Sequence, residues 1–176
     1  KRVAHELARD LPNVKTFATL SPIPGFCGWL AEQLATNAKH IAGGETPPVI
    51  HDLTGERSWA KALPVVLDRD DWFAQADVET ALKPILTQAC ADYLLSAKRA
   101  KSGRALDPVA HFHLSNGARI ERLNWLGDHS HEGLQRSAGM MVNYLYRLDE
   151  VDQNHESYTG DGLVKASNTM LKSIKP

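Results

Sequence analysis

The chain has 176 residues, of which 43% are hydrophobic and 23% are charged, and its formal net charge is −1. This length and balance are typical of one globular domain with its own apolar core. The near-neutral charge gives no general attraction to nucleic acid or anionic lipid, and no apolar run approaches the roughly 20 residues that a membrane helix needs. We therefore expect one domain over residues 1–176 that binds neither nucleic acid nor a membrane.

The first half of the chain predicts helix, strand and helix in turn. Residues 1–11 carry apolar side chains at four-residue spacing and predict the end of an amphipathic helix. The alternating "VKTFATL" (14–20) predicts a strand, and the prolines of "SPIPGF" predict a stiff bend that carries the hydroxyl of Ser21. A second helix is expected over about 27–41, and residues 49–76 predict only turns with short helical pieces.

The second half begins with the strongest helical signal. One apolar stripe continues through residues 78–94, so a helix is predicted from Asp77, with Pro84 as a possible kink. Further along, "GDHSHEGLQRSAG" predicts a polar, glycine-containing loop. Residues 140–158 predict a helix after this loop, and the tail from residue 161 predicts a last one.

Between these helices lies an Asn-Gly pair at 116–117, flanked by "VAHFHLS" and "ARIERLNWL". Asn-Gly is the strongest short-range signal for a β-hairpin, so we expect two antiparallel strands here. In a hairpin with a two-residue loop, His111 lies opposite Arg122 and His113 lies opposite Ile120. Both histidines then share one strand face, because side chains alternate along a strand.

Three interpretations of these histidines remain open from the residues alone. Each could be a structural residue, which is the commonest role of a single histidine. The second pair, His129 and His131, permits a metal site, although it sits in a predicted loop and further ligands would have to converge. Acid–base chemistry is the third, because an imidazole titrates near neutral pH.

Several sequence segments narrow the choice among these three interpretations: "TLSPIPGF", "DPVAHFHLSNGA", "LNWLGD", "SAGMMVNYLY" and "NHESY". Together they resemble the malonyl-CoA decarboxylase family over most of the chain, although residues 42–76 match poorly. The resemblance implies an α+β domain with a GNAT-type acyltransferase fold, in which helices flank a central, mostly antiparallel sheet. It also implies conversion of malonyl-CoA to acetyl-CoA and CO2, and homo-oligomerisation through a helical N-terminal domain that this sequence lacks.

The same resemblance implies three catalytic positions. They are Ser21 of "LSPIPGF", His113 (the second histidine of "HFH") and Tyr146 (the second tyrosine of "NYLY"). The family also has a glutamate before the serine, which we match to no residue here. No metal and no organic cofactor are expected, because the thioester of malonyl-CoA is itself the electron sink for loss of CO2.

We expect the phosphates of CoA to lie on residues 130–139, where a glycine-containing loop is predicted to open a helix and offer backbone N–H groups. The predicted CoA contacts are Ser130, Gly133, Arg136, Ser137, Gly139 and Asn143. Two other functions remain open at this point: an acyl-CoA acyltransferase of the same GNAT type, and a metal-dependent enzyme built on the two histidine pairs.

The chain begins at Lys1 rather than at a methionine, so we expect natural sequence upstream, and it shows no signal peptide. Cys27 and Cys90 form no Cys-x-x-Cys pair and no disulfide framework, which fits a reducing compartment. The cytoplasm is therefore the expected location, with the mitochondrial matrix as the alternative if a transit peptide has been removed.

Overall fold

A four-stranded antiparallel sheet organises the protein. The computed structural model describes residues 13–14, 16–41, 43–69 and 71–174. Its strands are β1 (Thr16–Ala18), β2 (Ser21–Pro22), β3 (Arg119–Asn124) and β4 (Met141–Arg147). β4 is central, because β1 and β2 pair along one of its edges and β3 pairs along the other. The α+β class with an antiparallel sheet is thus confirmed, and the GNAT-type topology stays a prediction.

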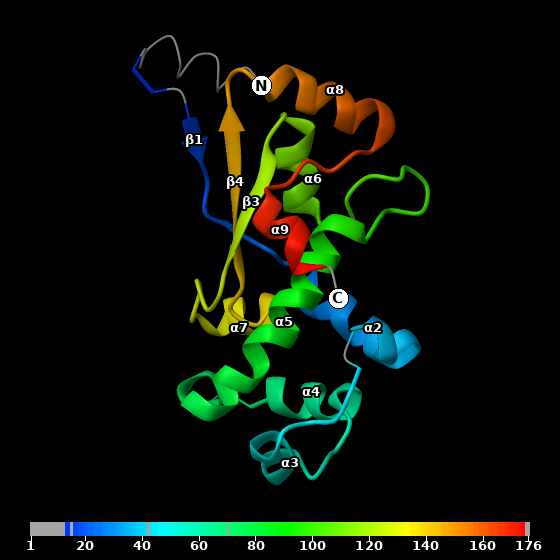
Figure 1. Cartoon of the computed structure of the whole chain (residues 1–176), viewed down its shortest axis with the longest axis vertical. Coiled ribbons are helices and arrows are strands. Elements are labelled where there is room, and N and C mark those ends of the chain that lie inside the picture. Colours follow the sequence, from blue (N-terminus) through cyan, green and yellow to red (C-terminus); the bar gives the residue numbers. More distant parts are fainter. Residues whose placement is uncertain (1–12, 15, 42, 70, 175–176) are drawn as a thin grey trace.

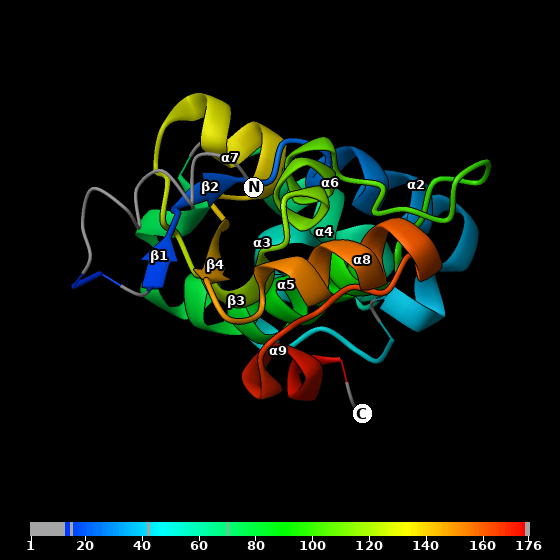
Figure 2. The same cartoon turned by 90° about the horizontal axis from the view of Figure 1, so that it is seen from above.

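Helices surround this sheet and extend the molecule beyond it. In chain order they are α2 (Phe26–Ile41), α3 (Pro48–Thr54), α4 (Trp59–Leu67), the 3-10 turn η1 (Trp72–Ala74), α5 (Ala76–Ser96), α6 (Pro108–Ser115), α7 (His131–Ser137), α8 (Val151–Asp161) and α9 (Asn168–Ser173). Helices α3 and α4 form the end of the molecule away from the strands (Figure 1). Seen from above, the strands gather at one side of the molecule and α2 lies at the other (Figure 2).

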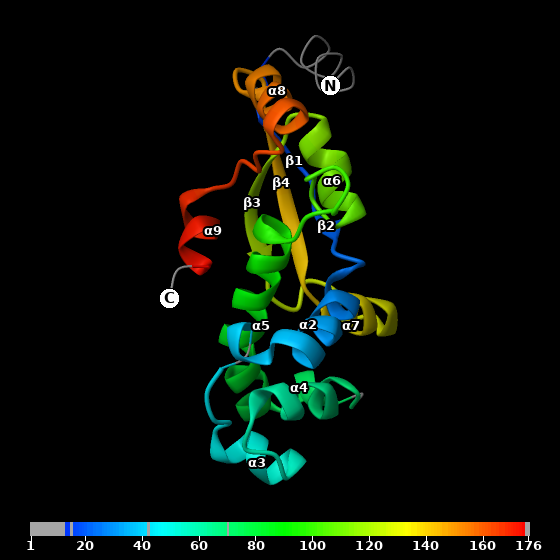
Figure 3. The ribbon, with the colours of Figure 1, turned by 90° about the vertical axis from the view of Figure 1, so that its right-hand side faces the viewer.

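Helix α5 is the longest helix in the described part of the chain and lies at the centre of the core. Its apolar stripe is buried from Val78 to Leu94, and it packs against α2, α3 and α9. Helices α6 and α9 lie on different sides of the strands (Figure 3). No helix among the described residues is both long enough and apolar enough to cross a membrane.

Several sequence predictions are confirmed in outline. β1 lies within the strand predicted at 14–20, and α2 matches the helix predicted at 27–41. The helix predicted from Asp77 is α5, and the predicted last helix is α9. The helix predicted for residues 1–11 lies outside the described residues.

The predicted hairpin around the Asn-Gly pair is wrong. Its first half is helix α6, which Asp107 caps by accepting hydrogen bonds from the N–H groups of Val109 and Ala110. The helix ends at Gly117 (φ +84°) in a Schellman motif: the N–H of Gly117 bonds to the carbonyl of Leu114, and that of Ala118 to the carbonyl of His113. The left-handed glycine therefore ends a helix instead of forming a hairpin turn.

The helix predicted over 140–158 is also wrong in its first half, which is strand β4. β-branched and aromatic side chains alternate there at Val142, Tyr144 and Tyr146, and the first two are fully buried. Period-2 burial of such residues is the mark of a strand. Tyr146 therefore lies on a strand, and the helical signal belongs to α8 alone.

A further correction concerns the predicted polar loop before residue 140. The loop contains α7, capped by the Ser130 hydroxyl, which accepts a hydrogen bond from the N–H of Gly133 at 3.0 Å. The chain leaves α7 through Ala138 and Gly139, both at positive φ, and enters β4 directly. Helix α7 therefore lies within the stretch that we predicted to be a loop, and strand β4 follows it where we predicted a helix.

Candidate active site

His113 connects the other two predicted catalytic side chains, Ser21 and Tyr146. Its Nε2 lies 3.2 Å from the Ser21 hydroxyl, and its Nδ1 lies 2.7 Å from the Tyr146 hydroxyl. The Ser21 hydroxyl lies 2.9 Å from that of Thr19, so one chain of hydrogen bonds connects four side chains. Ser21 and His113, which are 92 positions apart in the sequence, are thus in direct contact.

Strand β4 sets two of these positions. Ser21 of β2 is in register with Val142 of β4. Tyr146 lies on β4 as well, two residues after Tyr144. The ring of Tyr144 stacks on the imidazole of His113, with centroids 4.3 Å apart and planes 19° apart. The ring of His113 is thus held at both nitrogens and on one face.

Asp107 connects the segment after Ser21 to helix α6. Besides capping α6, its carboxyl accepts hydrogen bonds from the N–H of Gly25 (3.4 Å) and from the hydroxyl of Tyr93 (3.2 Å). Gly25 has no space for a side chain, because a Cβ there would collide with the Tyr93 hydroxyl. One buried carboxyl therefore fixes the β2–α2 connection relative to the helix that carries His113.

Burial determines the protonation of the site. It lowers the pKa of His113 and raises the pKa of Tyr146 to about 12. At neutral pH His113 is therefore mainly the neutral imidazole, and Tyr146 keeps its proton. Ser21 is only 5% exposed, which restricts the water around its hydroxyl.

His111 belongs to a different cluster. Its Nδ1 lies 2.8 Å from the Tyr158 hydroxyl, which in turn accepts a hydrogen bond from the N–H of Ala105. Burial, followed by the charges of Arg99 and Arg104, lowers the pKa of His111. Because the histidines lie two positions apart on a helix, they face different partners, and the expectation that they share a face is wrong.

The second histidine pair makes no metal site with the first. His129 stacks on Phe73, with ring centroids 5.8 Å apart. Within the described ranges, no group of three or more His, Cys, Asp or Glu side chains is placed to hold a metal ion.

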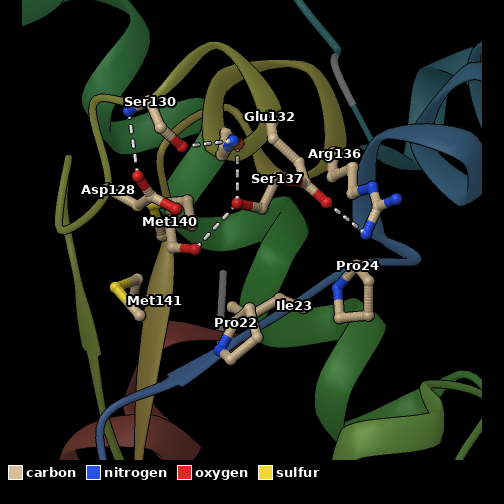
Figure 4. A pocket seen from close by; sticks show the side chains of 11 residues that line it. Pro22, Ile23, Pro24, Asp128, Ser130, Glu132, Arg136, Ser137, Met140 and Met141 are labelled. Atoms are coloured by element: carbon tan, nitrogen blue, oxygen red, sulfur yellow. Dashed lines mark hydrogen bonds and ion pairs between the residues drawn. The ribbon is translucent and has the colours of Figure 1, made fainter.

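A pocket of about 330 Å³ lies between the prolines after Ser21 and helix α7 (Figure 4). Four of the six predicted CoA contacts line it: Ser130, Gly133, Arg136 and Ser137. Arg136 forms an ion pair with Glu132 at 2.7 Å, and the Asp128 carboxylate accepts a hydrogen bond from the N–H of Ser130. Two backbone N–H groups expected to meet phosphate, those of Ser130 and Gly133, are thus used within the protein.

The remaining two predicted CoA contacts do not line this pocket. Gly139 (φ +73°) forms the turn into β4. Asn143 lies within β4, where its amide donates to the carbonyl of Thr19 and its side-chain oxygen accepts from Arg122 and Asn124. In this structure Asn143 holds strands together.

Sequence reasoning missed Thr19, Tyr144 and Asp107. Asp107 could have been found, because Asp followed by Pro is a common helix start and Asn116-Gly117 is a helix stop eight residues after Pro108. Thr19 and Tyr144 carry no such local signal, since their importance depends on contacts with distant residues.

The comparisons with known proteins agree with one another. The family model described as "Malonyl-CoA decarboxylase C-terminal domain" matches residues 1–176. The curated proteins named "Malonyl-CoA decarboxylase, mitochondrial" from Anser anser anser and Rattus norvegicus are 40% and 38% identical to this chain over 99% of its length. The chain spans 35% and 36% of those relatives.

Solved structures show the same relationship. The crystal structure of malonyl-CoA decarboxylase from Rhodopseudomonas palustris has 42% sequence identity and a TM-score of 0.79, and the match covers 98% of this chain and 36% of that one. The structure of malonyl-CoA decarboxylase from Agrobacterium vitis has 35% identity and a TM-score of 0.79, over 99% of this chain and 39% of that one.

Proposed function

The chain belongs to the malonyl-CoA decarboxylase family, and we propose that it carries the site at which malonyl-CoA loses CO2 to give acetyl-CoA. The observation that supports this assignment is the hydrogen-bonded series Ser21, His113 and Tyr146. It places a hydroxyl and an imidazole side by side in a largely buried setting, where an anion can be held and a proton delivered.

The reaction needs no cofactor in this proposal. When the bond to the carboxylate breaks, its electron pair passes into the thioester carbonyl and forms an enolate. The protein must therefore hold the carboxylate out of the plane of the thioester, so that the breaking bond overlaps the carbonyl, and must then protonate the carbon.

Ser21 is proposed to orient the carboxylate. Its backbone is extended and paired with β4, and Pro22 restricts the next step of the chain. Its hydroxyl is already positioned by Thr19 and His113. A fixed hydroxyl can donate a hydrogen bond to one carboxylate oxygen and set the torsion of the bond that breaks.

His113 is proposed to supply the proton. In the free protein burial lowers its pKa, but an adjacent substrate carboxylate favours the imidazolium and raises that pKa again. After CO2 leaves, Nε2 transfers its proton to the enolate carbon and the imidazole becomes neutral. Tyr146, as a neutral phenol, accepts the hydrogen bond from Nδ1–H in the protonated state.

The same geometry argues against Ser21 as a nucleophile that forms an acyl-enzyme. A serine triad uses a carboxylate behind the histidine to stabilise the imidazolium that forms when the base takes the serine proton. Here the third member is Tyr146, whose pKa of about 12 keeps it uncharged. Without that charge the imidazole is a poor base for Ser21.

The pocket beside Ser21 is the proposed seat of the CoA diphosphate. It begins at Pro22, the residue after the proposed carboxylate-binding serine, and its wall includes buried Gly133 and Ser137 of α7. Binding there requires Arg136 to exchange Glu132 for phosphate, which is possible because both side chains are well exposed.

The first experiment is incubation of malonyl-CoA alone with the natural full-length protein. We expect equal amounts of acetyl-CoA and CO2 with no added acceptor and with metal chelator present, measured by chromatography and by CO2 release. An acyltransferase would need an acceptor, so turnover that appears only with an added amine or alcohol would contradict the proposal.

Gly133→Leu should raise the KM for malonyl-CoA about tenfold, with a smaller change in kcat. A Cβ at Gly133 collides with the Asp128 carboxylate, so the side chain must push into the pocket or displace its wall. Gly160→Leu is the control, because a Cβ at Gly160 meets no atom within 4 Å. An unchanged KM in Gly133→Leu would count against the CoA assignment.

A further inference from the structure

Of the aromatic rings that contact His113, the ring of Tyr144 lies closest to the imidazole. Tyr144 lies in the middle of β4, is fully buried and is in register with Ile120 of β3. Its carbonyl accepts a hydrogen bond from the N–H of Thr19 at 2.9 Å. The backbone of Tyr144 is therefore fixed by the hydrogen bond from the β1–β2 connection and by the pairing of β4 with β3.

The stacking distance shows how close this contact is. The rings of Tyr144 and His113 are nearly parallel, with centroids 4.3 Å apart. The rings of His113 and Tyr146 meet edge to face, with centroids 6.0 Å apart. Hydrogen bonds at the two nitrogens act within the plane of the imidazole, and the Tyr144 ring restricts motion out of that plane. Together they direct Nε2 at Ser21.

Tyr144 contacts His113 through its ring face and not through its hydroxyl. The hydroxyl is buried and has no hydrogen-bond partner among the described residues. Burying an unpaired hydroxyl costs stability, so nothing about the hydroxyl explains the choice of this side chain. An aromatic face, by contrast, attracts a cation placed over it, and a protonated histidine is such a cation.

We propose that Tyr144 is a positioning residue for His113: its ring holds the imidazole in line with Ser21 and Tyr146 and favours the protonated form that delivers the proton. The inference rests on the proposed function in one respect, namely that the proton of His113 is delivered to the enolate carbon. The other groups that face His113 are Ser21 of β2, Tyr146 of β4 and Phe112 of its own helix, and the Asp107 carboxyl is turned to Gly25 and Tyr93.

The test is the pH dependence of His113 modification by diethyl pyrocarbonate, which reacts with the neutral imidazole, followed by peptide mass spectrometry on the full-length protein. Tyr144→Leu should move the midpoint of the His113 reaction down by about 0.5–1 pH unit, because the imidazolium loses the aromatic face. It should also lower kcat three- to tenfold at neutral pH, with KM within about twofold of the wild type.

Two variants complete the comparison. Tyr144→Phe keeps the ring and should leave the midpoint and kcat unchanged, with an equal or higher Tm. Tyr158→Leu removes an equally buried tyrosine whose ring contacts His111 instead, and it should leave the His113 midpoint in place. If Tyr144→Leu does not fold, Tyr144→Met replaces it, because its flexible side chain fills more of the space.

The proposal is overturned if a folded Tyr144→Leu or Tyr144→Met variant keeps the wild-type midpoint and kcat. It is also overturned if Tyr144→Phe is as impaired as Tyr144→Leu, or if Tyr158→Leu shifts the His113 midpoint equally. The modification experiment uses no malonyl-CoA, so its outcome is independent of whether the protein decarboxylates that substrate.

Discussion

His113→Ala should lower kcat for CO2 release by about 10²–10⁴, the usual effect of removing a general acid or base. The imidazole is the only side chain that contacts both the Ser21 and the Tyr146 hydroxyls within the described residues. Its loss removes the proposed proton donor and one of the two side chains that contact the Ser21 hydroxyl. Steady-state CO2 release by the full-length variant measures this effect, with circular dichroism as the check on folding.

His111→Ala is the matched control, since it removes the same side chain from the same helix two residues away. His111 contacts Tyr158, so its loss should cost some stability, about 1 kcal/mol for one hydrogen bond, and little turnover. A dead His111→Ala variant beside a nearly normal His113→Ala variant would show that the two histidines are assigned the wrong way round.

Asp107→Ala should destabilise the protein by about 2–4 kcal/mol and lower kcat as well. The substitution removes the cap of α6 and leaves the Gly25 N–H and the buried Tyr93 hydroxyl without their acceptor. The two segments that carry the proposed catalytic groups then loosen, because this carboxyl joins them. Urea unfolding and steady-state kinetics on the same preparations give the two quantities.

Ser167→Ala provides the comparison for a helix cap away from the proposed site. The Ser167 hydroxyl caps α9 by accepting a hydrogen bond from the N–H of Met170 at 3.2 Å, and it donates one to the carbonyl of Glu121 at 2.6 Å. We expect a loss of about 1–2 kcal/mol with kcat unchanged. Equal losses of stability in the two variants, with kcat unaffected in Asp107→Ala, would mean that Asp107 is only a cap.

Helix α5 could be predicted from its long apolar stripe, whereas the type of the shorter segments α6 and β4 could not. α5 continues for 21 residues, and an apolar stripe of that length and spacing is compatible with a helix and not with a strand. α6 has eight residues, and over so short a length the intrinsic preferences for helix and strand differ little. The Asn-Gly pair was taken as a hairpin turn, although the same glycine conformation also ends helices.

Helices α2 and α5 could be predicted from the pattern of apolar residues, which is present in the chain before it folds. The α+β class, the family and the three candidate catalytic residues followed from the resemblance of the long ordered sequence segments. That His113 lies on a helix, that Tyr146 lies on a strand and that both meet at one site with Ser21 depends on contacts between distant segments. Ser21 and His113 are 92 positions apart and His113 and Tyr146 are 33 apart, so their contacts exist only because β4 pairs with β2 while Asp107 joins α6 to Gly25, in the segment after β2.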